Sequence, residues 1–256
     1  AFKQLSPGSD VKDWIVAAGQ VGGLGAADLN FPDHFAAHDA TQMANFLSDA
    51  ELALNGVAMR YYTDPGFKLG AFTHPDLAVR KAALDITKQG IDVCAAMGGK
   101  TVTLWMGQDG FDYAFQMDYA AAWDRTIETI SELCAHNLAI DIAIEYKPNE
   151  PRAYALMPDI GTTLLACKEV SAPNLGVTLD FAHVLYADEM PAHSAALIGR
   201  HSRMIGLHLN DGYGKRDDGL MVGSVHAIQT VELLVAMLRM NQTDVIYFDT
   251  FPDMGG

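Results

Sequence analysis

Basic side chains, cysteines and long apolar runs are scarce in this chain of 256 residues. Lysine and arginine together number 17 against 32 aspartates and glutamates, which gives a formal charge of −15. Such a surface repels phosphate backbones and anionic lipid, so we expect neither nucleic acid nor a membrane as a partner. No apolar run approaches the roughly 20 residues that a membrane-spanning helix requires.

The few cysteines and the first residues indicate the compartment. Residues 1–4 have neither the basic nor the apolar region of a signal peptide. The cysteines are odd in number, far apart and each within an apolar helical pattern: Cys94, Cys134 and Cys167. Buried thiols in a reducing compartment explain this arrangement, so we expect a cytoplasmic protein.

Short β-rich runs alternate with helical patterns almost from end to end. The runs are apolar on both faces, as expected for parallel strands that helices cover. There are seven of them: Ala26–Phe31, Gly56–Tyr62, Thr101–Met106, Ala139–Glu145, Leu175–Phe181, Met204–Asn210 and Val245–Asp249. The helical patterns between them carry a single apolar stripe, typical of a helix packed on a core. Two examples are Trp123, Ile127, Ile130 with Cys134, and Ile228, Val231, Val235 with Leu238.

This alternation predicts one α/β domain over residues 1–256. A (β/α)8 TIM barrel is favoured over an open doubly wound sheet. The reasons are that no glycine fingerprint follows the first strand, and that polar residues cluster at the C-terminal ends of the strands. An eighth strand would precede the helix expected at Val11–Gly19, with only its tail, Ala1–Lys3, in the chain. No closing helix follows Asp249, so we expect a barrel clipped at the first strand and the last helix.

Four consecutive strands each carry a carboxylate or an imidazole at or near their C-terminal end: Glu145, Asp180, His208 and Asp249. In a barrel these ends meet at one rim, where converging carboxylates would repel one another. One such residue alone more often caps a helix or forms a salt bridge. Four in register instead predict a shared site for Mg, Mn or Co.

A second group of candidate ligands adjoins the first. His183 follows Asp180 by three residues, and the loop after His208 carries Asp217. His183 and Asp217 can complete a second cation site, which we expect alongside the first. The competing interpretation is a solvated loop whose charges face water.

Three further side chains are candidates for substrate contact. Lys147 lies two residues past Glu145, so strand alternation points both into the barrel, where a lysine can hold a substrate oxygen. The alternative is a structural lysine–carboxylate pair. Trp105 and Tyr62 end two other strands and offer apolar walls, although aromatic residues at strand ends are often only core.

The order of these motifs resembles that of xylose isomerases. The segment Glu145–Arg152 looks like their Glu-Pro-Lys-Pro-Asn-Glu-Pro-Arg sequence. Other stretches continue the likeness in the same order: Gly66–Thr73, Leu104-Trp105, the Asp180/His183 pair, His208–Asp211 and Asp249. The resemblance runs from about Gly56 to Asp249 and indicates the xylose isomerase-like superfamily.

The resemblance implies a sugar isomerase, an intramolecular oxidoreductase that interconverts aldose and ketose by a hydride shift between C1 and C2. Glu145, Asp180, His208 and Asp249 would then bind a structural cation, and His183 with Asp217 a catalytic one. Lys147 would contact the substrate's O1, and Trp105 and Tyr62 would flank its carbon atoms. In that scheme Lys147, Glu145, Asp249 and His183 form the catalytic set.

Departures from the xylose isomerase pattern concern the substrate. Asp180 and His208 stand where xylose isomerases have Glu and Asp, a ligand pattern that resembles L-rhamnose isomerase. Gly219 replaces a second aspartate of the catalytic cation. The aligned ring-opening position holds Pro32, and His34, two residues later, is the candidate for that role, although a surface histidine is the simpler interpretation.

Two other functions remain open. A keto-sugar 3-epimerase of the same superfamily uses one cation, and Glu145 and Asp249 can exchange the proton at the inverted carbon. A non-catalytic sugar-binding module needs neither cation nor Lys147. A phosphoesterase acting on DNA conflicts with the negative charge. For the isomerase, the epimerase and the binding module, the expected partner is a small sugar. By the same resemblance we expect a homo-oligomer.

Overall fold

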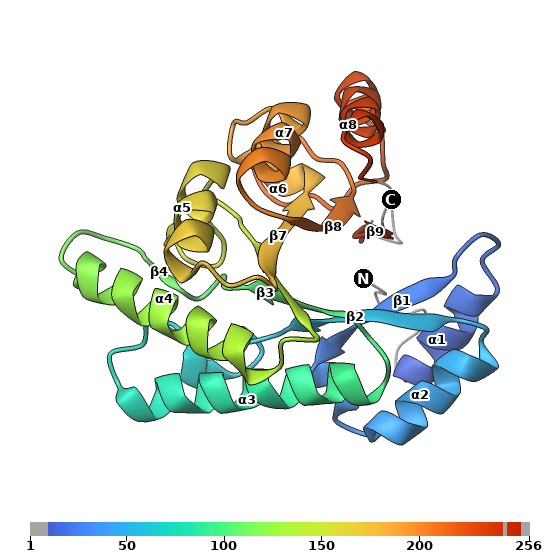
Figure 1. Cartoon of the computed structure of the whole chain (residues 1–256), viewed down its shortest axis with the longest axis horizontal. Coiled ribbons are helices and arrows are strands. Elements are labelled where there is room, and N and C mark those ends of the chain that lie inside the picture. Colours follow the sequence, from blue (N-terminus) through green and yellow to red (C-terminus); the bar gives the residue numbers. More distant parts are fainter. Residues whose placement is uncertain (1–9, 243–244, 252–256) are drawn as a thin grey trace.

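The computed structural model describes residues 10–242 and 245–251. Seven parallel strands form one sheet that curves into a nearly closed barrel (Figure 1), in the order β1-β2-β3-β5-β7-β8-β9. The strands are β1 (Ala26–Phe31), β2 (Ala53–Met59), β3 (Thr101–Trp105), β5 (Asp141–Glu145), β7 (Leu175–Asp180), β8 (Met204–Leu209) and β9 (Ile246–Phe248). Each predicted run overlaps one strand, although β2 begins and ends three residues earlier than the predicted run Gly56–Tyr62, and the prediction of a TIM barrel is confirmed.

Helices cover the outside of this sheet (Figure 1). They are α1 (Val11–Gly19), α2 (Ala40–Asp49), α3 (Leu77–Ala96), α4 (Tyr119–His136), α5 (Ile160–Val170), α6 (Phe181–Tyr186), α7 (Pro191–His201) and α8 (Ala227–Arg239). Short 3-10 turns, η1 (Asp33–Phe35) and η2 (Pro65–Phe67), follow β1 and β2, and β4 (Gly110–Phe111) pairs antiparallel with β6 (Tyr154–Ala155). Within the described ranges, no helix has the length and apolarity needed to cross a membrane.

Aspartates begin helices α1 to α5. In each case the side chain accepts a backbone N–H of the first turn: Asp10, Asp39, Asp76, Asp118 and Asp159. Such caps stabilise a helix by about 1 kcal/mol, and their negative charge favours the N-terminal end of the helix dipole. Part of the acidic excess therefore serves helix formation rather than a ligand.

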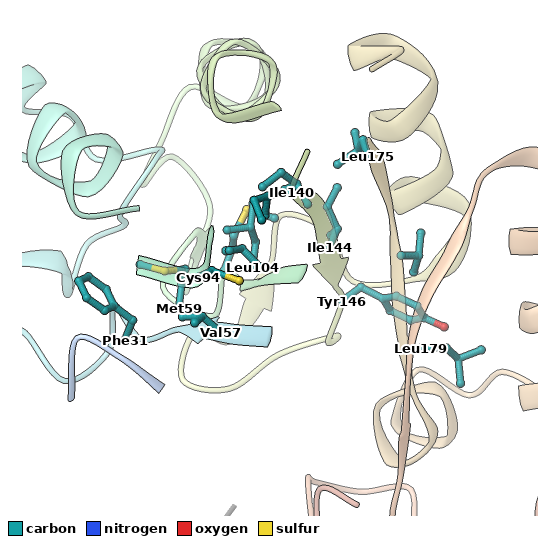
Figure 2. Close-up of a cluster of buried hydrophobic side chains, with 14 of the residues drawn as sticks. Phe31, Val57, Met59, Cys94, Leu104, Ile140, Ile144, Tyr146, Leu175 and Leu179 are labelled. Atoms are coloured by element: carbon teal, nitrogen blue, oxygen red, sulfur yellow. The ribbon is translucent and has the colours of Figure 1, made fainter. Parts of the chain in front are cut away.

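Alternate residues of each strand face different environments. On β5, Ile142 and Ile144 are fully buried in the hydrophobic core, whereas Glu145 lines a cavity inside the barrel. Figure 2 shows part of this core, including Val57, Leu104 and Ile144 from three adjacent strands. Because side chains alternate along a strand, apolar packing against the helices fixes which side chains face inward.

The sheet is open between its first and last strands. β1 pairs only with β2, and β9 only with β8, among the strands of the described ranges. A cavity of about 470 Å³ lies here, lined by residues of both edges such as Ala27 and Phe248. The predicted tail of a further strand, Ala1–Lys3, falls outside the described residues.

One predicted apolar stripe faces solvent. In α4 the prediction is confirmed, since Ile130 and Cys134 are buried and Trp123 and Ile127 pack against the core. In α8 it is wrong, because four apolar residues are largely exposed: Ile228, Val231, Val235 and Leu238. Leu233 and Met237 are buried in their place. The helix is apolar on two sides, and periodicity alone does not tell which side the barrel covers.

Candidate metal centre

The inward positions at the C-terminal ends of four strands bring together the predicted ligands. Glu145 ends β5, Asp180 ends β7, His208 lies in β8, and Asp249 directly follows β9. Asp180 and His208 are register partners across β7 and β8. Tyr247 of β9 is the register partner of His208. Asp249 lies two residues beyond Tyr247, at the next position that faces into the barrel.

These four side chains form a compact cluster. Each offers one ligand atom, and these atoms all lie within 4.8 Å of one another. Glu145, Asp180 and His208 are buried, and Asp249 is half-buried. The predicted convergence is confirmed.

Charges within the cluster perturb one another. Burial would raise the pKa of Glu145, but the charges of His208 and His183 outweigh it and lower this pKa to about 2. Burial raises the pKa of Asp180 to about 6. Burial opposes a charged His208, yet the carboxylates of Glu145 and Asp249 raise its pKa to about 10. The cluster therefore favours positive charge at its centre.

The cluster fits a divalent cation. His208 Nδ1 lies 3.4 Å from Glu145 Oε1, 3.8 Å from Asp180 Oδ2 and 4.0 Å from Asp249 Oδ2. It is buried and has no aligned hydrogen bond to any of them. Three carboxylates and one imidazole are a donor set that suits Mg, Mn or Co. An orphaned nitrogen among three carboxylates is the arrangement expected where a cation is held.

Asn210, to which the sequence analysis gave no role, orients one of the ligands. Its Nδ2 lies 3.1 and 2.9 Å from the two oxygens of Asp180 and donates to them. Its Oδ1 accepts the backbone N–H of Ala182 at 2.8 Å, so the amide cannot rotate freely. Strand alternation from His208 was the available signal, since Asn210 is the next inward position.

The residues predicted for a second cation also meet, but around a lysine. Asp217 Oδ2 accepts from Lys147 Nζ at 3.2 Å and lies 3.2 Å from His183 Nε2. Lys147 also pairs with Glu150 at 3.0 Å. Burial would raise the pKa of Asp217, but the His183 hydrogen bond and the neighbouring charges hold it far below its ordinary value. The Lys147 ammonium group thus already neutralises the Asp217 carboxylate.

The predicted aromatic wall lies beside Lys147. Lys147 Nζ is 5.1 Å from the centre of the Trp105 ring, and the Tyr62 ring meets Trp105 edge-on at 5.2 Å. Trp105 and Tyr62 line a cavity of about 320 Å³ together with Glu145, His208 and Asp249. The indole N–H of Trp105 is buried without a hydrogen-bond partner. It is therefore a buried donor whose hydrogen bond is unmade in the described structure.

His34 lies apart from this cavity. It belongs to η1, where the backbone N–H of Asn30 donates to its Nδ1 at 3.1 Å. Its Nε2 lies 3.3 Å from the Asn30 side chain. Burial, assisted by the charge of Arg60, lowers the pKa of His34 to about 4, so its ring is neutral. In the described part of the chain, Asn30 lines the cavity and His34 does not.

Asp28 in β1 is a cavity residue that the sequence analysis missed. It accepts a hydrogen bond of 2.9 Å from Asn55 Nδ2, and burial raises its pKa. Its mid-strand position gave no signal, because the polar residues were sought at strand ends. The signal that was available is its spacing of two residues from Asn30, which faces the same cavity.

Solved sugar enzymes share this architecture. A D-allulose 3-epimerase from Methylomonas sp. in complex with D-allulose has a TM-score of 0.75 at 16% identity, covering 94% of this chain and 77% of that one. A D-psicose 3-epimerase with D-tagatose from Clostridium cellulolyticum H10 has 0.73 at 17%, covering 97% and 82%. A xylose isomerase domain protein from Alicyclobacillus acidocaldarius has 0.70 at 16%, covering 96% and 86%. At such identities the likeness concerns the fold alone.

The comparison with protein families shows the family as well as the fold. The family described as Xylose isomerase-like TIM barrel matches residues 16–254. This range includes the barrel strands and the four residues of the cluster. The resemblance read from the motifs is thereby confirmed, and the chain belongs to the xylose isomerase-like TIM barrel family.

Proposed function

We propose that this protein is an enzyme, a divalent-metal-dependent ketose 3-epimerase, which inverts the carbon next to the ketone by proton transfer. The observation that carries this proposal is that the described residues hold one four-residue ligand cluster, beside a lysine that neutralises Asp217. A second cation there would have to displace Lys147. One cation flanked by two carboxylates suits proton exchange. The similarity to psicose and allulose 3-epimerase structures adds support.

Glu145, Asp180, His208 and Asp249 would hold the cation, which supplies positive charge against which negative charge can develop on the substrate oxygens. Asp180 is committed to Asn210, so we assign it a holding role only. We assign the proton exchange to Glu145 and Asp249, the two other carboxylates of the cluster, both of which line the cavity.

Glu145 and Asp249 approach the cluster from different strands, with β7 and β8 between them. One carboxylate takes the proton from the carbon beside the ketone, and the electron pair of that C–H bond stays with the substrate. The other carboxyl group, which is protonated at the start, donates its proton to the opposite face of the same carbon and becomes a carboxylate, which inverts that carbon. The Trp105 indole N–H and the Lys147 ammonium can orient the sugar by donating to its oxygens.

The expected aldose–ketose isomerase is the second candidate. It is favoured by His183 and Asp217, whose side chains meet where a second cation would be held. The Lys147 ion pair weakens this interpretation, because the hydride shift expected from the resemblance uses two cations. The similarity to epimerases also favours the alternative that the sequence analysis left open.

Deuterium exchange distinguishes the two reactions. The Mn-loaded protein is incubated in D₂O with D-fructose, D-tagatose, D-psicose and L-ribulose, and the products are analysed by NMR. An epimerase incorporates solvent deuterium at the inverted C3. A hydride shift instead forms an aldose and keeps the substrate hydrogen, which would contradict the proposal.

Matched variants test the assigned residues. Glu145→Gln and Asp249→Asn should each abolish epimerisation, because inversion needs a proton carrier on each face of the carbon and each variant removes one. Glu132→Gln is the control, since Glu132 is an exposed carboxylate paired with Lys88 on the outside of the barrel. Sugar affinity that persists in Glu145→Gln and under chelation, without turnover of any sugar, would instead indicate a binding module.

A further inference from the structure

Arg60 brings a positive charge to the wall of the sugar cavity. It follows β2 by one residue, and its backbone N–H donates to the Phe31 carbonyl at 2.8 Å, which ties it to the end of β1. Ala58, two residues earlier, lines the same cavity. Strand alternation therefore explains why Arg60 faces inward. Among the cavity-lining residues of the described chain, Arg60 is the only lysine or arginine.

The guanidinium of Arg60 makes no ion pair with a described carboxylate, although its charge helps to lower the pKa of Glu145. Its Nε is buried without a hydrogen-bond partner, and no described carboxylate lies within ion-pair distance of it. Its contact is with the Tyr62 ring, whose centre is 5.4 Å away. By contrast, Arg152 donates to Asp112 at 3.0 Å, and both terminal nitrogens of Arg203 donate to one carboxylate.

The acidic groups of the cavity are already matched by other partners. Asp217 pairs with Lys147 and His183, and the cluster carboxylates surround His208 at the cation position. Asp28 accepts from Asn55, and burial disfavours its charged form. A buried donor without an acceptor carries a desolvation cost that a bound acceptor removes.

We propose that Arg60 binds an anionic group, a carboxylate or a phosphate, carried by the sugar substrate. This inference rests on the proposed function, since it names the substrate class of the same site. A guanidinium presents a planar fork of donors that matches two oxygens of such a group at once, whereas hydroxyl groups match it singly. The Tyr62 ring lies beside the guanidinium, and the cavity has the volume expected of a small-molecule site.

Isothermal titration calorimetry on the Mn-loaded protein tests this assignment. The probes are D-fructose, D-fructose 6-phosphate and 2-keto-D-gluconate, which share a ketose framework and differ in charged group. The proteins are wild type, Arg60→Gln, Arg60→Lys and the control Arg200→Gln. Arg200 is an exposed arginine on α7. Thermal melts show whether each variant is folded.

The ratio of dissociation constants is the readout. Wild type should bind one anionic ketose about tenfold more tightly than D-fructose, as a charge-assisted contact implies. The ligand that shows the preference distinguishes phosphate from carboxylate. In Arg60→Gln the ratio should fall to about one, Arg60→Lys should retain part of it, and Arg200→Gln should keep the wild-type ratio.

Two results would overturn the assignment: equal affinities for all three probes in wild type, or a preference that survives Arg60→Gln. These results are independent of the proposed reaction. Deuterium exchange with D-fructose would uphold the epimerase even if Arg60 had no role. Conversely, the affinity ratio remains measurable if no sugar is turned over.

Discussion

The cluster of Glu145, Asp180, His208 and Asp249 predicts a measurable stabilisation by Mn²⁺. A ligand that binds only the folded state at about 100 times its Kd stabilises it by about 2.7 kcal/mol. For a chain of this size, each kcal/mol raises the melting temperature by roughly 2 to 4 °C. Removing Mn²⁺ with EDTA and restoring it should therefore shift the melt by roughly 5 to 10 °C.

Differential scanning fluorimetry measures this shift in wild type, Asp180→Asn and Asp92→Asn. Asp180→Asn removes one ligand and should lose most of the shift, whereas Asp92 lies outside the barrel, paired with His136, and its variant should keep it.

Because the pKa values of His208 and Asp180 are raised, to about 10 and about 6, cation binding displaces protons. The shift should therefore grow between about pH 5.5 and about pH 7.5. An unchanged wild-type melt, or a full shift in Asp180→Asn, refutes the cation site.

Four other substitutions have defined outcomes. Asn210→Ala should weaken Mn²⁺ binding by about 10- to 100-fold in a calorimetric titration, because Asp180 loses both amide contacts. Asp211→Asn should lower the free energy of unfolding by about 1.5 to 3 kcal/mol at neutral pH in urea titrations. The pKa of Asp211 is lowered because backbone N–H groups outweigh burial, so this difference should vanish as the pH falls through that lowered pKa. Leu233→Ala should cost about 2 to 5 kcal/mol and Ile228→Ala within about 0.5, since only the former is buried.

The strands and the four-residue cluster were predictable because both depend on a local rule. An apolar run buried on both faces marks a parallel strand, and the residue that ends it lies at the barrel rim. Glu145, Asp180 and Asp249 each follow such a run, so position alone brought them together. The barrel could therefore be predicted without knowing which side chains contact one another.

Contacts between distant loops could not be predicted in this way. Asp217 and Lys147 are 70 residues apart, and their ion pair depends on how the loop after β8 folds back over the cavity. Its place in the loop after His208 and the family resemblance indicated Asp217 as a ligand, and neither showed that it pairs with Lys147. The exposed face of α8 was missed for a related reason, because burial depends on neighbours that a helical pattern does not identify.

The open seam between β1 and β9 affects how the protein must be handled in such experiments. In the described ranges, the outer edge of each of these two strands has no strand beside it. Peptide groups along an unpaired edge can join an extended segment of another molecule. We therefore expect concentrated samples to associate edge to edge, so light scattering at several dilutions should accompany every melt and titration.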